Sequence, residues 1–380
     1  MRRKVVGFAI IVAMALACWL WLRARPVRSL PISCQIAANL PEGEFVSERF
    51  PEIRDLAFAD LDGDGLQDKV VVDEKFISPV KAKALLRIYW GDRRGRETLG
   101  EVVYLSWSIP RKPLLFLADL DGDGQKEIVS FMDAPNYRLA LKAWAFDRQQ
   151  KRVRQVSQIV TDAPFGADRT EVVDLGRDGW EEIVTFYWGW ETGWGLKGFL
   201  TLARGKATVW VFGWDEQKRW WQKKATFKSK GRIIVPVSIA PMRVMPILRI
   251  MHLRTPSADF FAIPVEVAES RWNWQGLCFS PDWQYFTLLL QANSPDPSRW
   301  RLVTEIEGKP MNTADLDGDG IEELIAFDKG SFSLVRVSKG KVEIATLRGK
   351  GVPEVLIPRQ PNGQIFVRWE RSQWLQVSIR

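Results

Sequence analysis

Histidine is almost absent from this chain, whose 380 residues include one, His252. The commonest general acid and base of enzymes is therefore nearly missing, and catalysis near pH 7 would have to rest on carboxylates. His252 itself lies in a strand-like run over residues 250–253, which favours a structural role for its ring.

Most of the chain has no large excess of basic over acidic residues. The net charge is +8, but the first 30 residues hold six basic side chains and no acidic one, which leaves +2 for residues 31–380. A body this close to neutrality has no global field for phosphate chains, so nucleic acid is not an expected partner. Hydrophobic residues at 46% and charged residues at 26% exclude a disordered chain, a collagen and a multi-span membrane protein.

Residues 1–30 have the features of an export or anchoring segment. Three basic residues at positions 2–4 precede an uninterrupted apolar run over residues 5–22, which Arg23 and Arg25 end. As a helix this run would be about 27 Å long, just enough to cross a thin hydrocarbon core. A buried core helix would not have cations at both ends. We therefore expect one N-terminal hydrophobic helix that anchors the protein in a membrane.

Three forms of this segment remain open. An uncleaved signal-anchor is favoured, because the apolar run continues past the small-residue site at 15–17, where a cleaved signal would normally end. Cleavage after Ala17 would give a secreted protein, and lipidation of Cys18 a lipid-anchored one. All three place residues 31–380 outside the cytoplasm. In an oxidising compartment the two remaining cysteines, Cys34 and Cys278, either pair as a disulfide or stay separately buried thiols.

A repeat organises the body of the chain. Four segments align without gaps: residues 60–68 (DLDGDGLQD), 119–127 (DLDGDGQKE), 174–182 (DLGRDGWEE) and 315–323 (DLDGDGIEE). The first three begin 59 and 55 residues apart, and the fourth begins 141 residues later, which leaves room for about two units without the motif. In a degenerate fifth copy at 346–354 we expect Arg348 and Lys350 to face Glu354 without a metal.

Strand-like runs flank each copy. Residues 56–58 and 70–72 surround the first copy, and residues 114–117 and 128–131 surround the second. These runs are rich in β-branched and aromatic residues, so the motif is predicted to be the loop of a β-hairpin. Each unit continues with an alternating strand, a polar turn and a further strand. Four short strands per unit of about 50–60 residues are typical of a propeller blade.

In these loops and strands, residues 53–380 resemble FG-GAP/VCBS repeat proteins, whose blades build β-propellers of the integrin-α type. The resemblance implies an all-β fold, with a β-propeller of six or seven four-stranded blades over residues 31–380 behind the helix of residues 1–30. Residues 225–310 depart from the family pattern. They contain strand-like runs at 233–237 and 286–290 but no metal loop.

The loops have the composition of calcium sites. Aspartates at alternate positions place hard anionic oxygens around one point, and the intervening glycines accept the required backbone angles. An oxygen-only shell suits Ca²⁺ better than zinc or copper, which favour nitrogen and sulfur donors. The resemblance implies ligands at positions one, three, five, seven (a carbonyl) and nine. These ligands are Asp60, Asp62, Asp64, Leu66 and Asp68; Asp119, Asp121, Asp123, Gln125 and Glu127; and Asp315, Asp317, Asp319, Ile321 and Glu323.

Two other interpretations of the loops are disfavoured. An EF-hand begins similarly but needs a glutamate at position twelve and flanking helices, whereas position twelve here is Val71, Ser130 or Ala326, inside a predicted strand. Acidic surface turns without a metal would crowd four carboxylates together with no counter-ion.

The third copy is expected to be a weak site. Gly176 removes the carboxylate at position three, and Arg177 adds a cation beside it. We expect its remaining carboxylates, Asp174, Asp178 and Glu182, to bind metal weakly or to pair with Arg177.

These features predict a non-catalytic, extracytoplasmic binding or scaffold module for a protein or glycan ligand, similar to an adhesion protein. Calcium would be structural, because the carboxylates serve as ligands and no array of His, Ser or Cys accompanies them. Four rings among the glycines of residues 186–195 are the candidate ligand contacts: Tyr187, Trp188, Trp190 and Trp194. Packing between blades is the competing role, since Trp90, Trp144 and Trp214 recur at one strand-to-turn junction. The alternative function, by analogy with the family, is a carbohydrate-active enzyme such as a polysaccharide lyase, which would need a basic cleft near a metal.

Overall fold

The computed structural model describes residues 27–37, 45–46, 56–78, 81–108, 114–134, 138–147, 150, 152–164, 170–195, 200–229, 232–234, 250–256, 258–273, 278–338, 341–358, 364–369 and 372–379. Their regular structure is β-strand apart from one short 3₁₀ turn, η3 (Pro297–Arg299), so the all-β expectation is confirmed. The helix expected over residues 5–22 lies outside the described residues. Within them, no helix is long and apolar enough to span a membrane.

The described strands form six sheets, each built on four antiparallel strands. The first three are β4 (Leu56–Ala59), β5 (Asp68–Ser78), β6 (Lys81–Gly91) and β7 (Glu97–Ser108); β8 (Leu114–Ala118), β9 (Glu127–Ala134), β10 (Arg138–Asp147) and β11 (Arg152–Pro164); and β12 (Thr170–Val173), β13 (Glu182–Gly195), β14 (Leu200–Trp214) and β15 (Trp220–Lys228). The next two are β17 (Met251–Arg254), β18 (Asp259–Asn273), β19 (Cys278–Ala292) and β20 (Arg301–Glu307); and β21 (Lys309–Ala314), β22 (Glu323–Asp328), β23 (Ser331–Ser338) and β24 (Lys341–Arg348).

The sixth sheet joins the two ends of the chain. It consists of β25 (Pro353–Pro358), β26 (Gln364–Trp369) and β27 (Leu375–Ile379), and β2 (Ile32–Ile36) pairs antiparallel with β27 as the fourth strand. Short strands extend three of the sheets: β1 (Val27–Ser29) runs parallel to β24, β3 (Phe45–Val46) pairs with β25, and β16 (Arg232–Ile234) pairs with β14.

Alternation of side chains along the strands explains how the sheets stack. Successive residues of a strand point to opposite faces, so in β9 Ile128 packs toward the first sheet while Val129 packs toward the third. Both are essentially inaccessible to solvent. Five apolar clusters of this kind join the six sheets in sequence order. Each sheet thus contributes to a core on one or both of its faces.

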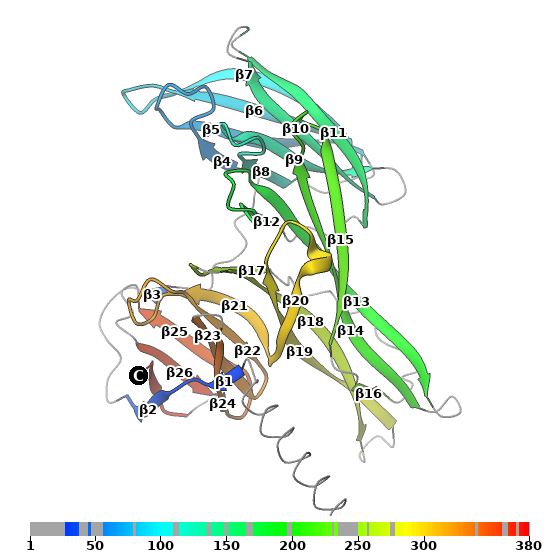
Figure 1. Ribbon diagram of the computed structural model, residues 1–380, viewed down its shortest axis with the longest axis vertical. Helices are drawn as coiled ribbons and strands as arrows, with labels where there is room; N and C mark the ends of the chain where they lie inside the picture. Colours follow the sequence, from blue (N-terminus) through cyan, green and yellow to red (C-terminus); the bar gives the residue numbers. More distant parts are fainter. Residues whose placement is uncertain are drawn as a thin grey trace, which may run out of the picture.

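The stacked sheets are consistent with a propeller-like fold, and their number agrees with the lower of the two expected blade counts. Figure 1 shows them along an open arc, with the first sheet near one end and the sixth near the other. Within the described residues no closed sheet forms, and no apolar cluster joins the sixth sheet to the first.

The four motif copies occupy one topological position. They connect the first and second strands of the first, second, third and fifth sheets. The fourth sheet, which accounts for the stretch without a motif, has a short turn there, closed by the Thr255 hydroxyl donating to the Ala258 carbonyl (2.7 Å). The predicted hairpin loops are therefore confirmed.

The degenerate copy at 346–354 does not follow this frame. It connects β24 to β25, and therefore links two sheets. Arg348 pairs with Glu307 at 2.8 Å, whereas Glu354 pairs with Arg368 at 2.5 Å across the hairpin of β25 and β26. The expectation that Arg348 and Lys350 face Glu354 is therefore wrong for Arg348. Arg348 is the last residue of β24, and its side chain reaches Glu307 in β20 of the fourth sheet, whereas Glu354 belongs to the sixth sheet.

Candidate metal-binding loops

The carboxylate at position nine closes each loop in the same way. It accepts the backbone N–H of the leucine at position two, at 2.9 Å in all four copies. Both partners are buried: the position-two leucines are at most 5% exposed and the position-nine acids at most 4%. The leucine therefore anchors each loop in the core, and the acid at the start of the following strand is held beside it.

The aspartate at position one organises the rest of the loop. In the first copy its Oδ1 accepts the N–H groups of Gly63 and Asp64, and its Oδ2 accepts that of Gly65. Gly63 and Gly65 have φ of +76° and +83°, in the left-handed region that glycine tolerates best. The loop thus turns its backbone amides inward around Asp60, which explains the fixed Asp-Gly spacing in the sequence.

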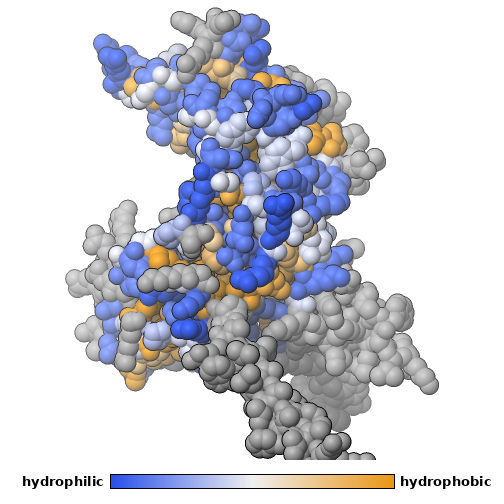
Figure 2. All heavy atoms as spheres, viewed as in Figure 1, coloured by the Kyte–Doolittle hydropathy of each residue, from blue (hydrophilic) through white to orange (hydrophobic). Residues whose placement is uncertain are grey.

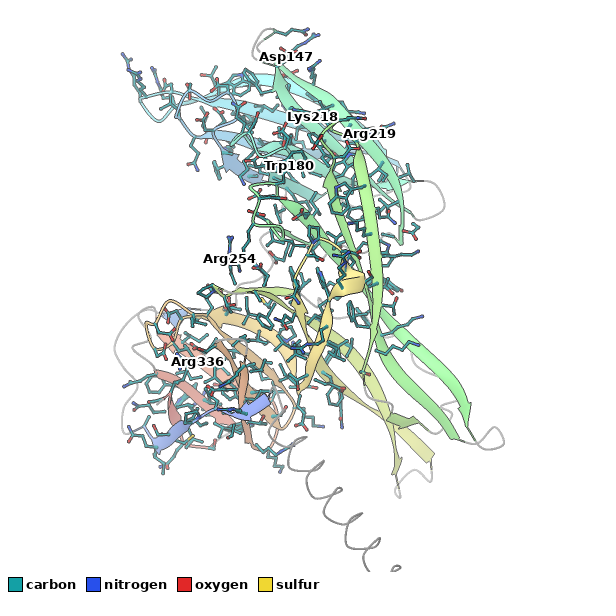
Figure 3. The ribbon with its side chains drawn as sticks, in the orientation of Figure 1. Asp147, Trp180, Lys218, Arg219, Arg254 and Arg336 are labelled. Atoms are coloured by element: carbon teal, nitrogen blue, oxygen red, sulfur yellow. The ribbon has the colours of Figure 1, made fainter. Side chains whose placement is uncertain are left out.

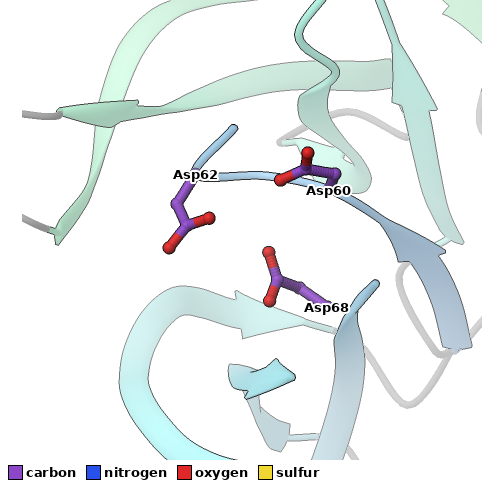
Figure 4. Close-up of side chains that lie close together, drawn as sticks. All are labelled: Asp60, Asp62 and Asp68. Atoms are coloured by element: carbon purple, nitrogen blue, oxygen red, sulfur yellow. The ribbon is translucent and has the colours of Figure 1, made fainter. Parts of the chain in front are cut away.

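Three of the four loops gather carboxylate oxygens that lie within 4.8 Å of one another. The groups are Asp60, Asp62 and Asp68; Asp119, Asp121 and Glu127; and Asp315, Asp317 and Glu323. Figure 4 shows the first group, with the three carboxylates turned toward a common point. These oxygen-only groups fit a hard divalent cation such as Ca²⁺.

The position-five aspartates lie outside these groups. Asp64, Asp123 and Asp319 each accept the N–H of position seven, at 2.8–2.9 Å. They brace the turn, and their part in metal binding stays a prediction, as does that of the carbonyls of Leu66, Gln125 and Ile321.

Burial makes the charged state of the position-nine glutamates costly. It raises the pKa of Glu127 to about 8 and that of Glu323 to about 7, with the neighbouring aspartates adding repulsion. Burial likewise raises the pKa of Asp62 and of Asp119. A cation bound among these groups would favour their ionised forms.

Basic side chains reach into two of the groups. Lys218, in the turn between β14 and β15, forms an ion pair with Asp121 of the second loop. Arg336, in β23, places its Nη2 2.8 Å from Asp317 Oδ2, bonds Asp319, and lies with its Nε 3.5 Å from Glu323 Oε1. No lysine or arginine in the described part of the chain pairs with Asp60, Asp62 or Asp64. Figure 3 shows Lys218 and Arg336 in opposite halves of the molecule.

The second loop also contacts the third sheet directly. Glu181 accepts the backbone N–H of Asp119 (2.7 Å) and pairs with Lys126 (2.6 Å), while its own N–H donates to the Asp119 carbonyl (2.7 Å). A Cβ at Gly122 would lie 2.6 Å from the Trp180 ring. Close packing of Trp180, as well as the left-handed φ, therefore requires glycine at this position.

The third loop does not gather three carboxylates, which agrees with the loss of the position-three acid at Gly176. Arg177 has a positive φ of 55° and points away from the loop's acids. It donates to the carbonyls of Thr255 and Pro256, each at 2.6 Å, and its Nη2 lies 3.6 Å from Asp259. The expected pairing of Arg177 with Asp174, Asp178 or Glu182 is therefore wrong, because the turn between β17 and β18 offers it carbonyls and a buried carboxylate.

The aromatic cluster of residues 187–194 is divided by strand alternation. Trp188 is buried in the core between the third and fourth sheets, so it serves packing, whereas Tyr187 on the opposite face is 40% exposed. The side chains of Trp190 and Trp194 lie outside the described residues. Trp144 and Trp214 are buried between sheets, as expected for architectural tryptophans.

His252 has a structural environment. Its Nε2 lies 2.9 Å from the buried Asp259, and its ring stacks on Phe261 at 5.1 Å between centroids. It also borders an open cleft of about 610 Å³ between the third, fourth and fifth sheets. The space-filling view shows a hollow on one side of the molecule, where Figure 3 places Arg254. The charged lining residues of the cleft are Asp174, Arg177, Glu181, Arg254 and Glu322.

The two body cysteines are not shown to pair. Cys34 in β2 is an exposed free thiol, which contradicts its expected burial. The side chain of Cys278 in β19 lies outside the described residues.

Sequence reasoning missed three kinds of residue at these loops. The position-two leucine is identical in all four copies, and this repetition is a signal that could have identified it. Lys218 and Glu181 contact the second loop from another sheet, and no local pattern marks them. Arg336 lies within β23, and an arginine among the apolar residues of a largely buried strand is a usable signal.

The chain was compared with models of known protein families and with curated proteins, and it matches none of them.

Proposed function

We propose that this protein is a calcium-stabilised, non-catalytic propeller that acts outside the cytoplasm as a binding or scaffold module. The observation that carries the proposal is the convergence of Asp60, Asp62 and Asp68 on one point, in a loop frame that the chain repeats. The loops use their acids to hold backbone amides and to gather oxygens. This arrangement stabilises the loop, and a bound divalent cation would balance the negative charge of the gathered carboxylates.

Calcium would stabilise the hairpins and the contacts between sheets. Three carboxylates within 4.8 Å repel one another, and a divalent ion offsets this repulsion. If free Ca²⁺ is about ten times Kd, each site adds roughly 1.4 kcal/mol to the free energy of unfolding. Modules outside the cell commonly bind calcium at about 10⁻⁴–10⁻³ M, so this contribution would be present there and lost in a low-calcium cytosol.

The cleft between the third, fourth and fifth sheets is the surface best suited to a ligand. It carries the cations Arg177 and Arg254 beside the acids Asp174 and Glu322. Such a lining fits a polar, hydrogen-bonding ligand, a glycan or a charged segment of a protein, better than an apolar one. Anchoring to a membrane through residues 5–22 belongs to the same proposal and rests on the sequence of that segment.

A lyase remains the second candidate, because the cleft combines cations with His252 and the acidic third loop. Incubation with acidic polysaccharides distinguishes the two. Unsaturated sugar products, detected by their ultraviolet absorbance, would favour the enzyme, whereas calcium-dependent retention without turnover would favour the binding module.

A capture experiment tests the binding proposal. The full chain is immobilised and presented with a glycan array and with secreted proteins, in calcium and in EGTA. We expect a defined glycan or protein to be retained in calcium. Retention should fall in Arg254→Ala and stay unchanged in Lys329→Ala, which removes an exposed cation that does not line the cleft. Equal retention by both variants would exclude this cleft as the binding surface.

A further inference from the structure

We propose that Lys218 and Arg336 are built-in competitors of the metal ion at the second and fourth motif loops, so that the first loop, residues 60–68, takes up a divalent cation first. The inference rests on the proposed calcium function and deepens it. It predicts that the three acidic groups differ in their affinity for a divalent cation, although their sequences are nearly the same.

The strand register places Arg336 directly beside the fourth loop. Val335 pairs with Leu324, so the next residue of β23, Arg336, lies opposite Glu323 at position nine. The corresponding positions of the first three sheets, given by the pairs Lys69–Tyr89, Ile128–Trp144 and Ile183–Phe212, hold Trp90, Ala145 and Gly213. Among the four sheets that carry a motif loop, the fifth alone has a cation at this position.

Arg336 supplies charge to the fourth group without completing its hydrogen bonds. Glu323 is fully buried, and its Oε1 has no hydrogen-bond partner; the Arg336 Nε, 3.5 Å away, has none either. The guanidinium instead binds Asp317 and Asp319. A buried carboxylate oxygen thus remains available for a ligand at the centre of the group, and a metal that takes it must displace or share Arg336.

Lys218 reaches the second group from outside its own sheet. It lies in the turn between β14 and β15 with a positive φ of 58°, a conformation that a lysine rarely adopts. Its ammonium pairs with Asp121, whose side chain is 9% exposed, while the lysine side chain is 48% exposed. An exposed lysine can move into solvent at small cost, so Lys218 is the weaker of the two competitors.

The first group has no competitor among the described residues. Asp60, Asp62 and Asp68 converge in the same way, and the basic residue nearest to them in sequence, Lys69, pairs with Glu97 at 2.7 Å. Its charge is therefore balanced only when a cation binds. We expect the order of affinity to be first loop, second loop, fourth loop.

Calorimetric titration of the full chain with Ca²⁺ tests this order, with terbium luminescence as a second readout of occupancy. The variants are Lys218→Met and Arg336→Met, and the matched control is Lys329→Met, which removes an exposed cation at the other end of β22 from the fourth loop. We expect K218M to tighten one weak site about fivefold, R336M to tighten another about tenfold or more, and K329M to change neither.

The outcomes separate the two proposals. Absence of Ca²⁺ binding by the unaltered chain would overturn the calcium function itself. Calcium binding with K218M and R336M indistinguishable from K329M would overturn the competition while the calcium function stands. If R336M does not fold without calcium but folds with it, the competition is supported. If R336M fails in both conditions, K218M decides, because Lys218 lies in an exposed turn where the substitution does not disturb packing.

Discussion

The guanidinium of Arg177 lies 3.6 Å from the carboxylate of Asp259, although Arg177 belongs to an acidic motif loop and Asp259 to the next sheet. Asp259 is 2% exposed and is also bonded to His252. Two cationic or hydrogen-bonding groups thus hold one buried acid at the junction of the third and fourth sheets. The third loop, which does not gather three carboxylates, forms a direct link to the neighbouring sheet through Arg177.

Replacing Arg177 with Gly should weaken this junction. The variant loses two hydrogen bonds to carbonyls and a partner of a buried acid, which we expect to lower the free energy of unfolding by about 1–3 kcal/mol. Glycine relieves the positive φ, which returns no more than about 1 kcal/mol. Urea denaturation measures the difference, with Arg219→Ala, which removes an exposed ion pair, as the control. Equal stability of R177G and the unaltered chain would show that the link contributes nothing.

Trp188 and Tyr187 should respond differently to truncation. Trp188→Ala removes a buried ring from the core of the third and fourth sheets and should cost about 3–5 kcal/mol. Tyr187→Ala, on the exposed face of the same strand, should change stability by less than about 0.5 kcal/mol. Thermal melts of both variants check this division. A small loss in W188A would mean that Trp188 is available to a ligand after all.

Glu182 should make the metal-free protein less stable as the pH rises. Burial raises its pKa from 4.5 to about 8, with Asp178 and Asp174 adding repulsion. A carboxyl group with a raised pKa in the folded state contributes its full stability below pH 4.5, and this contribution is lost as the pH rises toward and through 8. Glu182→Gln keeps an acceptor for the Leu175 amide and cannot ionise.

Melts of Glu182→Gln in EGTA at pH 5 and pH 8 measure this effect. The variant and the unaltered chain should be about equally stable at pH 5, and the variant should be more stable by roughly 1–3 kcal/mol at pH 8. Glu181→Gln, one residue away and paired with Lys126, controls for the loss of an acid. A difference that does not depend on pH would show that Glu182 stays ionised in the folded protein.

The sequence predicted the hairpins well because their signal is local. The Asp-Gly spacing and the apolar runs on either side define β4–β5, β8–β9, β12–β13 and β21–β22, and the structure confirms all four. The recurrence of Trp90, Trp144 and Trp214 at one strand-to-turn junction also predicted a packing role, and Trp144 and Trp214 are buried while Trp90 is partly buried against the same core as Trp144.

Features that depend on distant segments could not be predicted in this way. The pairing of β2 with β27 joins residues more than 300 positions apart, and the sequence of neither strand indicates which strand it pairs with. The destination of Arg177 depends on carbonyls that the neighbouring sheet presents. Lys218 reaches Asp121 only because the third sheet packs on the second. Arg336 reaches Asp317 only because β23 pairs with β22 within the fifth sheet.

Asp62→Asn should remove the strongest calcium site. Asparagine keeps the side-chain oxygen that accepts the Asp64 amide but removes a charge from the first group. We expect the tightest calorimetric transition to weaken about tenfold or to disappear. Asp296→Asn, at an exposed aspartate that likewise accepts a backbone amide, should leave binding unchanged. An unaffected tight site in D62N would place the strongest site elsewhere.

The most direct measurement is the melting temperature of the full chain in about 5 mM Ca²⁺ and in excess EGTA. The proposed cation sites predict a melting temperature several degrees higher in calcium, with most of that increase lost in Asp62→Asn. The same melting temperature in calcium and in EGTA, at a protein concentration where folding is reversible, would contradict the claim that these loops bind a stabilising metal ion.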